Sequence, residues 1–298
     1  MKIDKIYVAC CKADFYLTKI CVASIRYWNN SIPVYLLKDR SQGDFNTTEL
    51  ERAFNVFILP MKYQQLGAYG KLYPFIEENG SRIFVIDSDI VWIRDIIPEL
   101  EVFSEDIIIQ CDVPVDPEKE MNQWYFNTVN LYKHYNQYHY PGFLFNTGQF
   151  VCNTSSFSKE DFDETIHWKE KASPVFENTF LCEDQGILNY AVAKKTESSS
   201  VTYRHHNLFI WGYDPAINEI DIKQNNIPNH FPSLIHWFGN KTGLITGLPG
   251  SKILKFYDAC YYSKIDNGRI KKNISGLCRV IKHPVAYLKT IIKKIINR

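Results

Sequence analysis

Arg82-Ile83-Phe84-Val85-Ile86-Asp87-Ser88-Asp89-Ile90-Val91-Trp92 is a short apolar run that leads directly into two carboxylates one residue apart. A run of this length and composition predicts a buried strand over 82–86. In open α/β sheets, ligands bind at the carboxyl ends of the strands. We therefore expect Asp87 and Asp89 to lie at a ligand-binding edge of a sheet.

Strand and helix signals alternate around this run. Strands are expected at 3–11, 33–37, 56–59 and 82–86, and helices at 14–27, 44–54 and 65–78. This alternation predicts parallel βαβ units and an α/β fold with a Rossmann-like first half. Further strands are expected at 107–110, 143–152, 201–203 and 233–237, and further helices at 159–171, 183–194 and 251–264. Residues 112–140, which are rich in Asn, Gln, Tyr and His, are expected to form a long irregular loop.

Composition limits the class of protein. With 298 residues, 45% hydrophobic and 15% aromatic, the chain can bury a large core, which excludes a disordered protein. None of the eight cysteines forms a C-x-x-C pair, so we expect buried thiols in a reducing compartment. The sequence shows no secretory signal and no apolar stretch long enough to span a membrane. These features predict a cytoplasmic protein, and nothing in them points to a nucleic-acid partner.

The Asp87-Ser88-Asp89 motif has three chemical interpretations. Two close carboxylates repel each other unless a cation lies between them, and a divalent ion that also binds a pyrophosphate would resolve the conflict. A plain strand-end turn is the simplest alternative, because Asp and Ser favour turns. Phosphatases of the haloacid-dehalogenase type also carry D-x-D-x-[TV] after an apolar strand, and there Asp87 would be a nucleophile. The motif alone leaves all three open.

Other segments, taken in order, give the motif a context. They are Ala68-Tyr69-Gly70-Lys71-Leu72-Tyr73-Pro74, then Asp112 after the next strand, Phe145-Asn146-Thr147-Gly148, Glu183-Asp184-Gln185-Gly186-Ile187-Leu188-Asn189, and Ile235-His236-Trp237-Phe238-Gly239-Asn240-Lys241. Together with the D-x-D motif, their order and spacing resemble the GT-A glycosyltransferases, and among them the family-8 retaining enzymes. The resemblance implies a GT-A fold, with a mixed sheet flanked by helices, and a nucleotide-diphosphate sugar as donor.

The resemblance also implies roles for particular residues. Asp87, Asp89 and His236 would hold a metal, with Mn²⁺ favoured over Mg²⁺ by the imidazole nitrogen. The residues implied in donor binding are Ala9, Lys71, Ser88, Asp112, Asn146, Gly148, Gly239 and Lys241. In a retaining mechanism, Gln185 would line the β-face of an oxocarbenium-like centre and Asp184 would orient it or bind a sugar hydroxyl. An inverting enzyme would instead use Glu183 or Asp184 as a base.

Each of these residues also has a plain interpretation. His236 could be an ordinary aromatic neighbour of Trp237, and Lys71 and Lys241 could be surface lysines. Asp184 could simply occupy the first turn of a helix, where acids are favoured.

The segment Ala9-Cys10-Cys11-Lys12-Ala13-Asp14 departs from the family pattern. Family-8 members usually have an acid after the first strand that contacts uracil. Here Asp14 is either a displaced equivalent or a helix cap. A UDP-sugar remains the expected donor. The rival functions are the phosphohydrolase and a non-catalytic GT-A-like domain that binds glycan or membrane. A sugar nucleotidyltransferase fits poorly, since no Gly-rich basic loop follows the first strand.

Charge is distributed unevenly along the chain. Nine of the 34 basic residues and none of the 33 acidic ones lie in 267–298, which leaves 1–266 acidic. We expect a glycosyltransferase domain over 1–266 and a basic tail over 267–298, with an amphipathic helix at 284–298. A basic amphipathic helix predicts attachment of residues 279–298 to an anionic membrane surface. The protein would then lie at the inner face of the membrane and act on a glycan or lipid-linked acceptor. The alternative is a helix packed on the body or an oligomer contact.

Overall fold

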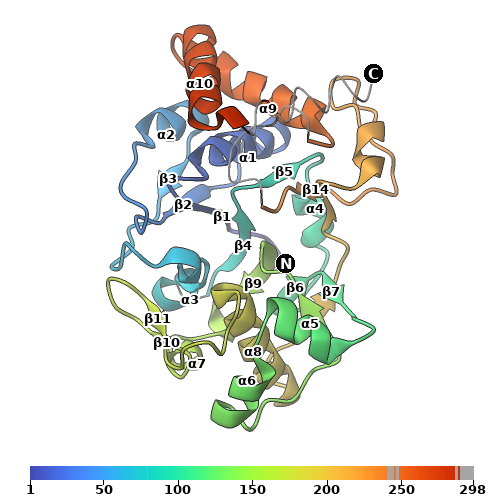
Figure 1. Ribbon diagram of the computed structural model, residues 1–298. Helices are drawn as coiled ribbons and strands as arrows, with labels where there is room; N and C mark the ends of the chain where they lie inside the picture. The colour runs from blue at the N-terminus through green and yellow to red at the C-terminus, as the bar shows by residue number, and fades with distance from the viewer. Residues whose placement is uncertain (79, 240–244, 246–247, 286–287, 289–298) are drawn as a thin grey trace.

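The computed structural model describes residues 1–78, 80–239, 245, 248–285 and 288 (Figure 1). A seven-stranded sheet with the order β12-β6-β9-β4-β1-β2-β3 forms its centre. Its strands are β1 (Lys5–Cys10), β2 (Val34–Lys38), β3 (Phe57–Ile58), β4 (Arg82–Asp87), β6 (Ile107–Ile109), β9 (Gln149–Asn153) and β12 (Tyr203–His205). Neighbouring strands are parallel except at β9, which is antiparallel to both β4 and β6. This mixed α/β sheet confirms the expected fold class.

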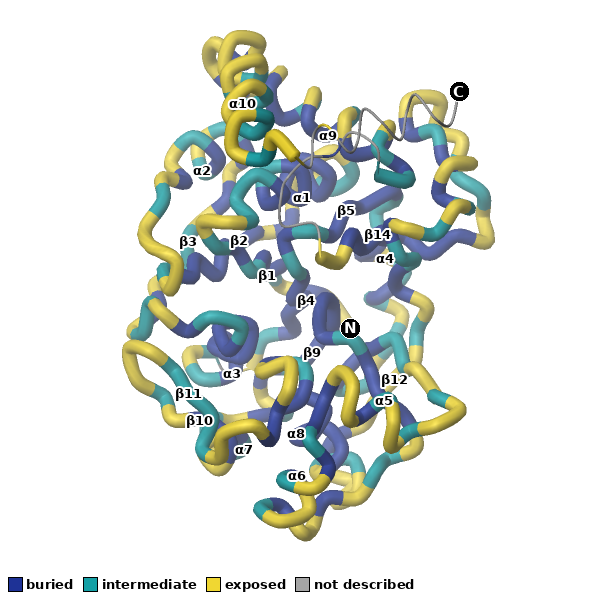
Figure 2. The backbone as a smooth tube through the Cα atoms, in the orientation of Figure 1, coloured by how far each residue is buried: buried dark blue, intermediate teal, exposed yellow. Residues whose placement is uncertain are grey.

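Both faces of the sheet are covered. Along β4, Phe84 and Ile86 point into one apolar core, whereas Ile83 and Val85 point into another, and all four are 0% exposed. The first core also contains side chains of α1 (Phe15–Trp28) and α9 (Ser251–Ser263), and the second contains those of α8 (Glu183–Glu197). Figure 2 shows the central strands as buried backbone between these layers. Because β4 is buried on both faces, its side chains must be apolar without interruption.

The helices at 14–27, 183–194 and 251–264 are confirmed as α1, α8 and α9, and the helix at 44–54 is shortened to α2 (Thr48–Phe54). The helix expected over 65–78 is divided into a 3₁₀ helix, η1 (Gly67–Leu72), and α3 (Pro74–Glu77). Pro74 has no N–H to continue the preceding turn but is well suited to the first position of a new helix. The break aims Lys71 toward the end of β4.

The prediction of an irregular loop over 112–140 was wrong. The segment contains α5 (Pro117–Trp124) and α6 (Thr128–His134). The Asp116 side chain accepts a hydrogen bond from Lys119 N at 3.1 Å, and the Asn127 side chain accepts one from Asn130 N at 3.1 Å. These are N-cap interactions, and Pro117 at the first helical position strengthens the first of them. The polar composition of the segment favoured a loop, but each helix has a local start signal in its N-cap residue.

The helix expected over 159–171 was also wrong. Only α7 (Glu160–Asp163) is helical, and the chain then forms the hairpin of β10 (Ile166–His167) and β11 (Ser173–Pro174). Thr165 ends the helix, because its N–H and its hydroxyl both donate to the Phe162 carbonyl at 2.9 Å. Side-chain bonding of this kind competes with helix continuation.

The strand expected over 143–152 is two strands. β8 (Leu144–Phe145) pairs with β7 (Cys111–Asp112), whereas β9 joins the central sheet. A separate three-stranded sheet, unforeseen in its order, has β14 (Leu234–His236) between β13 (Phe209–Trp211) and β5 (Ile90–Trp92). Because β14 is antiparallel to β5, His236 lies opposite Ile90, directly after the D-x-D motif. The remaining elements are α4 (Ile97–Leu100), η2 (Thr154–Ser156) and η3 (Pro215–Glu219).

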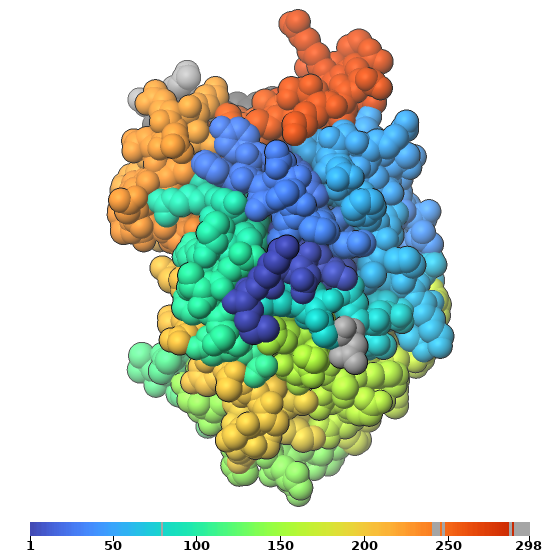
Figure 3. All heavy atoms as spheres, turned by 180° about the vertical axis from the view of Figure 1, so that it is seen from behind, coloured from blue at the N-terminus to red at the C-terminus, as the bar shows by residue number. Residues whose placement is uncertain are grey.

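The basic tail begins with α10 (Gly268–Lys282), which packs against α9. Lys272 pairs with Asp258 at 2.9 Å, and the Arg279 guanidinium lies 3.6 Å from the centre of the Tyr16 ring. In Figure 3, this C-terminal segment forms a ridge that protrudes from the body. Most of the helix expected over 284–298 lies outside the described residues. None of the described helices is long and apolar enough to cross a membrane.

The first βαβ unit depends on a buried arginine. Arg26 of α1 donates to the carbonyls of Phe54 at 2.8 Å, Ile32 at 2.7 Å and Asn55 at 2.9 Å, and so ties α1 to α2 and to the turn before β2. Burial lowers the pKa of Arg26 to about 10.

Replacing this arginine should therefore destabilise the protein. We expect Arg26→Met to lower the free energy of unfolding by about 2–4 kcal/mol, because three carbonyls lose charged donors. Arg52→Met, which removes an exposed arginine of α2, should change it by less than about 0.5 kcal/mol. Urea denaturation measures both, and equal shifts in the two variants would contradict this interpretation.

Candidate active site

The D-x-D turn is fixed by backbone bonds to two distant segments. Asp87 N donates to the Gly148 carbonyl at 2.7 Å, and Trp237 N donates to the Asp89 carbonyl at 3.0 Å. Asp87 is also in register with Ala9 at the end of β1. The carboxyl ends of β1 and β4 thus meet β14 at one edge of the sheet, where ligands bind in α/β folds.

Three side chains at this edge form a group able to hold a metal. Asp87, Asp89 and His236 each offer one ligand atom, and these atoms lie within 4.8 Å of one another. His236 Nε2 is 3.2 Å from Asp89 Oδ1, without hydrogen-bond geometry. His236 is 1% exposed, yet neither of its ring nitrogens has a hydrogen bond from any described residue. A buried imidazole without a hydrogen bond is costly, and a metal ligand role would satisfy one of its nitrogens.

Gly148 makes room for this histidine. A Cβ at position 148 would lie 2.5 Å from His236 Cε1 and 2.7 Å from Asn146 Oδ1. The backbone of Gly148 is not in the left-handed region, so only close packing requires a glycine here. Gly148 N also donates to Asn146 Oδ1 at 2.9 Å.

A buried lysine neutralises part of the acidic cluster. Lys71 Nζ lies 3.0 Å from Asp87 Oδ1 and 2.6 Å from Asp184 Oδ2, and it donates to the Thr147 carbonyl at 3.3 Å. Burial alone would lower the pKa of Lys71, but Asp184 and Asp87 outweigh burial and raise it above its ordinary value. Lys71 is therefore a permanent cation inside the site. The alternative of an ordinary surface lysine does not describe a side chain that is 7% exposed.

The carboxylates of the cluster act on one another. Burial raises the pKa of Asp87 to about 6, although Lys71 opposes the rise, and Asp89 and Asp184 add to it. Three carboxylates thus lie close enough to repel one another, and two of them, Asp87 and Asp184, pair with Lys71. A divalent cation with oxygen and nitrogen ligands would relieve this repulsion, so the residues fit the metal that the sequence predicted.

The N-terminus of α8 presents a hydrogen-bonded amide pair. Asn146 Nδ2 donates to Gln185 Oε1 at 2.9 Å, and Gln185 Nε2 donates to the Trp124 carbonyl at 3.2 Å. Asn189 fixes the strand that carries Asn146, since it accepts from Phe145 N at 3.0 Å and donates to the Phe145 carbonyl at 2.9 Å. Gln185 is held with its carbonyl toward Asn146.

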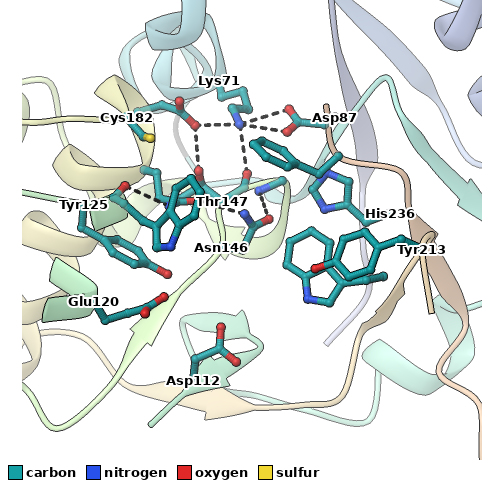
Figure 4. Close-up of a pocket in the computed structure, with 16 residues that line it drawn as sticks. Lys71, Asp87, Asp112, Glu120, Tyr125, Asn146, Thr147, Cys182, Tyr213 and His236 are labelled. Atoms are coloured by element: carbon teal, nitrogen blue, oxygen red, sulfur yellow. Dashed lines mark hydrogen bonds and ion pairs between the residues drawn. The ribbon is translucent and has the colours of Figure 1, made fainter. Parts of the chain in front are cut away.

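Two cavities meet at this cluster. The first has a volume of about 440 Å³ and the second about 350 Å³. Lys71, Asp87, Asp184 and Phe238 line both, so these side chains form a shared wall. In Figure 4, Lys71, Asp87 and His236 lie at one end of the first cavity, and Asp112 and Glu120 lie away from them.

The predicted site residues are distributed between the two cavities. The first cavity is lined by Lys71, Asp87, Asp112, Asn146, Gly148, Asp184, Gln185 and His236, and the second by Ala9, Lys71, Asp87, Ser88, Asp89 and Asp184. Asp14 also lines the second cavity, together with Asp39. Gly239 is exposed, has φ +82° and lines neither cavity, and Lys241 lies outside the described residues.

Several lining residues were missed by the sequence analysis. Glu120 and Trp124 come from α5, and Tyr125 directly follows it, in a segment that had been interpreted as loop. Trp211 and Tyr213 come from β13 and the segment after it. The Asp116-Pro117 helix start was the available signal for the first group. No motif in the sequence signalled that Trp211 and Tyr213 would line the cavity.

The sequence places the chain in a family. Residues 72–242 match the profile of the nucleotide-diphospho-sugar transferase family, and the protein belongs to that family. Its fold is accordingly that of the GT-A glycosyltransferases. Family membership favours sugar transfer over the phosphohydrolase that the D-x-D motif alone left open. No curated protein matches the sequence.

Solved glycosyltransferases share the fold at low identity. The apo bifunctional glycosyltransferase WbbM aligns with a TM-score of 0.56 at 14% identity over 86% of this chain and 49% of its own. Apo GlyE of Streptococcus pneumoniae TIGR4 aligns with a TM-score of 0.52 at 15% identity, over 92% of this chain and 62% of its own. Galactosyltransferase LgtC, solved with donor and acceptor sugar analogues, aligns with a TM-score of 0.51 at 16% identity, over 90% of this chain and 99% of its own. The chain thus spans about half of WbbM and under two thirds of GlyE.

The packing at Gly148 gives a test of the metal group. We expect Gly148→Ala to weaken Mn²⁺ binding by about ten-fold, because the new methyl group displaces the His236 ring. Gly276→Ala is the matched control, since a Cβ there meets nothing within 4 Å. Calorimetric titration with Mn²⁺ measures both variants. Unchanged affinity in Gly148→Ala would show that His236 is not a ligand.

Proposed function

We propose that the protein transfers a hexose from a UDP-sugar to a glycan or lipid-linked acceptor, with a divalent metal and with retention of anomeric configuration. The observation that carries this proposal is the wall shared by the two cavities beside the Asp87, Asp89 and His236 group. A nucleotide in the second cavity would direct its diphosphate to this wall and its sugar into the first. The family supplies the nucleotide-sugar chemistry.

Asp87, Asp89 and His236 would hold the metal, which we propose to be Mn²⁺ or Mg²⁺. When bound, the ion neutralises negative charge on the nucleoside diphosphate, as a Lewis acid does. Lys71 keeps the Asp87 carboxylate in place and is a second source of positive charge at the same wall. Because Lys71 is buried, water screens its charge little.

Donor recognition is proposed for residues on either side of the wall. Ala9 and Ser88 line the second cavity, where the nucleoside would lie. Asn146 and Asp112 line the first cavity and offer side-chain oxygens to sugar hydroxyls. Gly148 has no side chain, so the donor sugar can approach the backbone closely beside these two residues. Gly239 and Lys241 remain candidates for the diphosphate from the segment after β14.

The positions of Asp184 and Glu183, at the start of α8, favour a retaining mechanism over an inverting one. Asp184 Oδ2 is paired with Lys71 at 2.6 Å and accepts from Thr147 Oγ1 at 2.7 Å, and Glu183 lines neither cavity. Neither is well placed as the base that inversion needs. The Gln185 amide does line the first cavity, and its oxygen can stabilise a positive anomeric centre. Asp184 then acts by fixing Lys71 and the start of α8.

A donor screen tests the activity. We expect UDP-hexoses with Mn²⁺ to be hydrolysed slowly without acceptor, and GDP-sugars to react less. Asp89→Asn should lower this hydrolysis by about 100-fold, because a metal carboxylate is lost. Asp266→Asn removes an exposed carboxylate and serves as control. Chromatography of released nucleotide gives the rate, and NMR of the product gives the anomer.

Other outcomes of the screen separate the rivals. Hydrolysis of aryl phosphates with a phosphoenzyme that Asp87→Asn abolishes would favour the phosphohydrolase. Nucleotide binding without metal dependence, and no turnover of any donor, would favour a non-catalytic domain.

We also propose that the C-terminal region attaches the protein to an anionic membrane surface at the cytoplasmic face. Four apolar side chains at helical spacing on α10 are more than half exposed; they are Ile270, Ile274, Leu277 and Ile281. Arg269 and Lys282 lie on the same helix, and further lysines follow in 289–298. A helix with an apolar stripe and flanking cations suits a headgroup boundary.

Liposome sedimentation tests this attachment. We expect the protein to sediment with vesicles of anionic phospholipid and less with zwitterionic ones. Ile274→Ser/Leu277→Ser should lower the bound fraction by about ten-fold, since two apolar side chains are lost. Val102→Ser/Val129→Ser removes two exposed apolar side chains elsewhere and should leave binding unchanged. Deletion of 279–298 without effect would reject the proposal.

A further inference from the structure

The first cavity extends beyond what the proposed donor would occupy. Beyond Asp112, which we assigned to the donor sugar, the cavity is lined by Glu120, Trp124, Tyr125 and Tyr213, and we call these four residues its outer half; none of them lines the second cavity. In Figure 4, Glu120 and Tyr125 lie on one side of the cavity, and Tyr213 and His236 lie on the other. A donor whose nucleotide fills the second cavity reaches the shared wall with its sugar. The outer half is then left for the second substrate.

Aromatic rings form two walls of the outer half. Trp124 is 40% exposed and Tyr213 60% exposed, so both rings have accessible surface that a ligand in the cavity can contact. Tyr213 is held in place by stacking on Trp211, with ring centres 5.7 Å apart and planes 9° apart. Rings that are rigid, apolar on their faces and polar at one end suit a pyranose, which presents C–H groups on its faces and hydroxyls on its edge.

Glu120 makes the outer half negatively charged, and Asp112 is its neighbour at the same end of the cavity. Burial, and then the neighbouring Glu120, raise the pKa of Asp112. Two acids from different elements, β7 and α5, thus act on each other at this end of the cavity. Among the described residues that line the cavity, Lys71 is the one lysine or arginine, and Asp87 and Asp184 already pair with it.

A carboxylate accepts hydrogen bonds and donates none, so it binds hydroxyl or ammonium groups and repels an acid. We propose that the outer half binds the terminal pyranose of the acceptor, and that Glu120 selects neutral or amino sugars over sugar acids. This inference rests on the proposed function and specifies the acceptor class for the same site. Glu120 is a specificity residue in it, and Trp124 and Tyr213 are the stacking surfaces.

Acceptor kinetics with matched glycosides test the inference. The probes are nitrophenyl hexosides, their 2-amino counterparts and the corresponding hexuronides, each at saturating donor. We expect kcat/KM for the uronide to be about ten-fold below that for the neutral hexoside, and Glu120→Gln to reduce this gap by about five-fold through the uronide KM. Trp124→Ala should raise KM for every acceptor by about ten-fold, because stacking area is lost.

Glu118→Gln is the matched control. It makes the same substitution on the same helix, but Glu118 is exposed and lines neither cavity, so the preference between acceptors should stay as in the wild type. Equal use of uronide and hexoside by the wild type would overturn the inference. So would a preference that Glu120→Gln and Glu118→Gln alter equally.

Binding of the same glycosides without donor is measured in parallel by saturation-transfer NMR. We expect contacts from the neutral glycosides that Trp124→Ala removes, and weaker ones from the uronide. If neutral glycosides do not bind, the inference is wrong even where donor hydrolysis succeeds. If they bind with the expected preference while no donor is hydrolysed, the inference stands and the proposed donor chemistry fails.

Discussion

The ion pairing of Lys71 with Asp87 and Asp184 is the interaction on which the rest of the site depends. These three side chains come from η1, β4 and α8, and their charges converge where the sheet ends. Removing the lysine would leave two carboxylates uncompensated in a buried place, which is far more costly than losing an exposed pair. The break between η1 and α3 at Pro74 makes this geometry possible. The two acids are therefore held in place without a ligand.

The second constraint is steric, and it comes from the other end of the chain. β14 runs antiparallel to β5, so His236 enters the cluster from a segment almost 150 residues after the D-x-D motif. Its ring needs the space that Gly148 leaves open. The same arrangement places Phe238 and Lys71 in the wall between the two cavities. A single cluster thus forms the wall between the two cavities, which we propose to hold the nucleotide on one side and the sugars on the other.

Charge also explains how the tail meets the body. Lys271 pairs with Glu49 and Lys272 with Asp258, so part of the basic excess of the tail neutralises the acidic domain. The apolar side chains of α10 consequently face away from the protein. Part of the contrast between body and tail, visible as composition, therefore serves to attach the helix to the body.

Local patterns determined much of this protein from sequence alone. The apolar runs specified β1, β2, β4 and β6, and the order of the motifs indicated both the transferase fold and the acidic cluster, because strand burial and strand-end position follow from short-range periodicity. Tertiary structure decided what depends on distant partners. It made Lys71 an internal counter-ion, brought Glu120 and Trp124 from a supposed loop into the cavity, and left an apolar stripe of α10 exposed. The start of α5 had a local signal at Asp116-Pro117, but where each of these side chains lies depends on contacts between segments far apart in the chain, which no short window of sequence reveals.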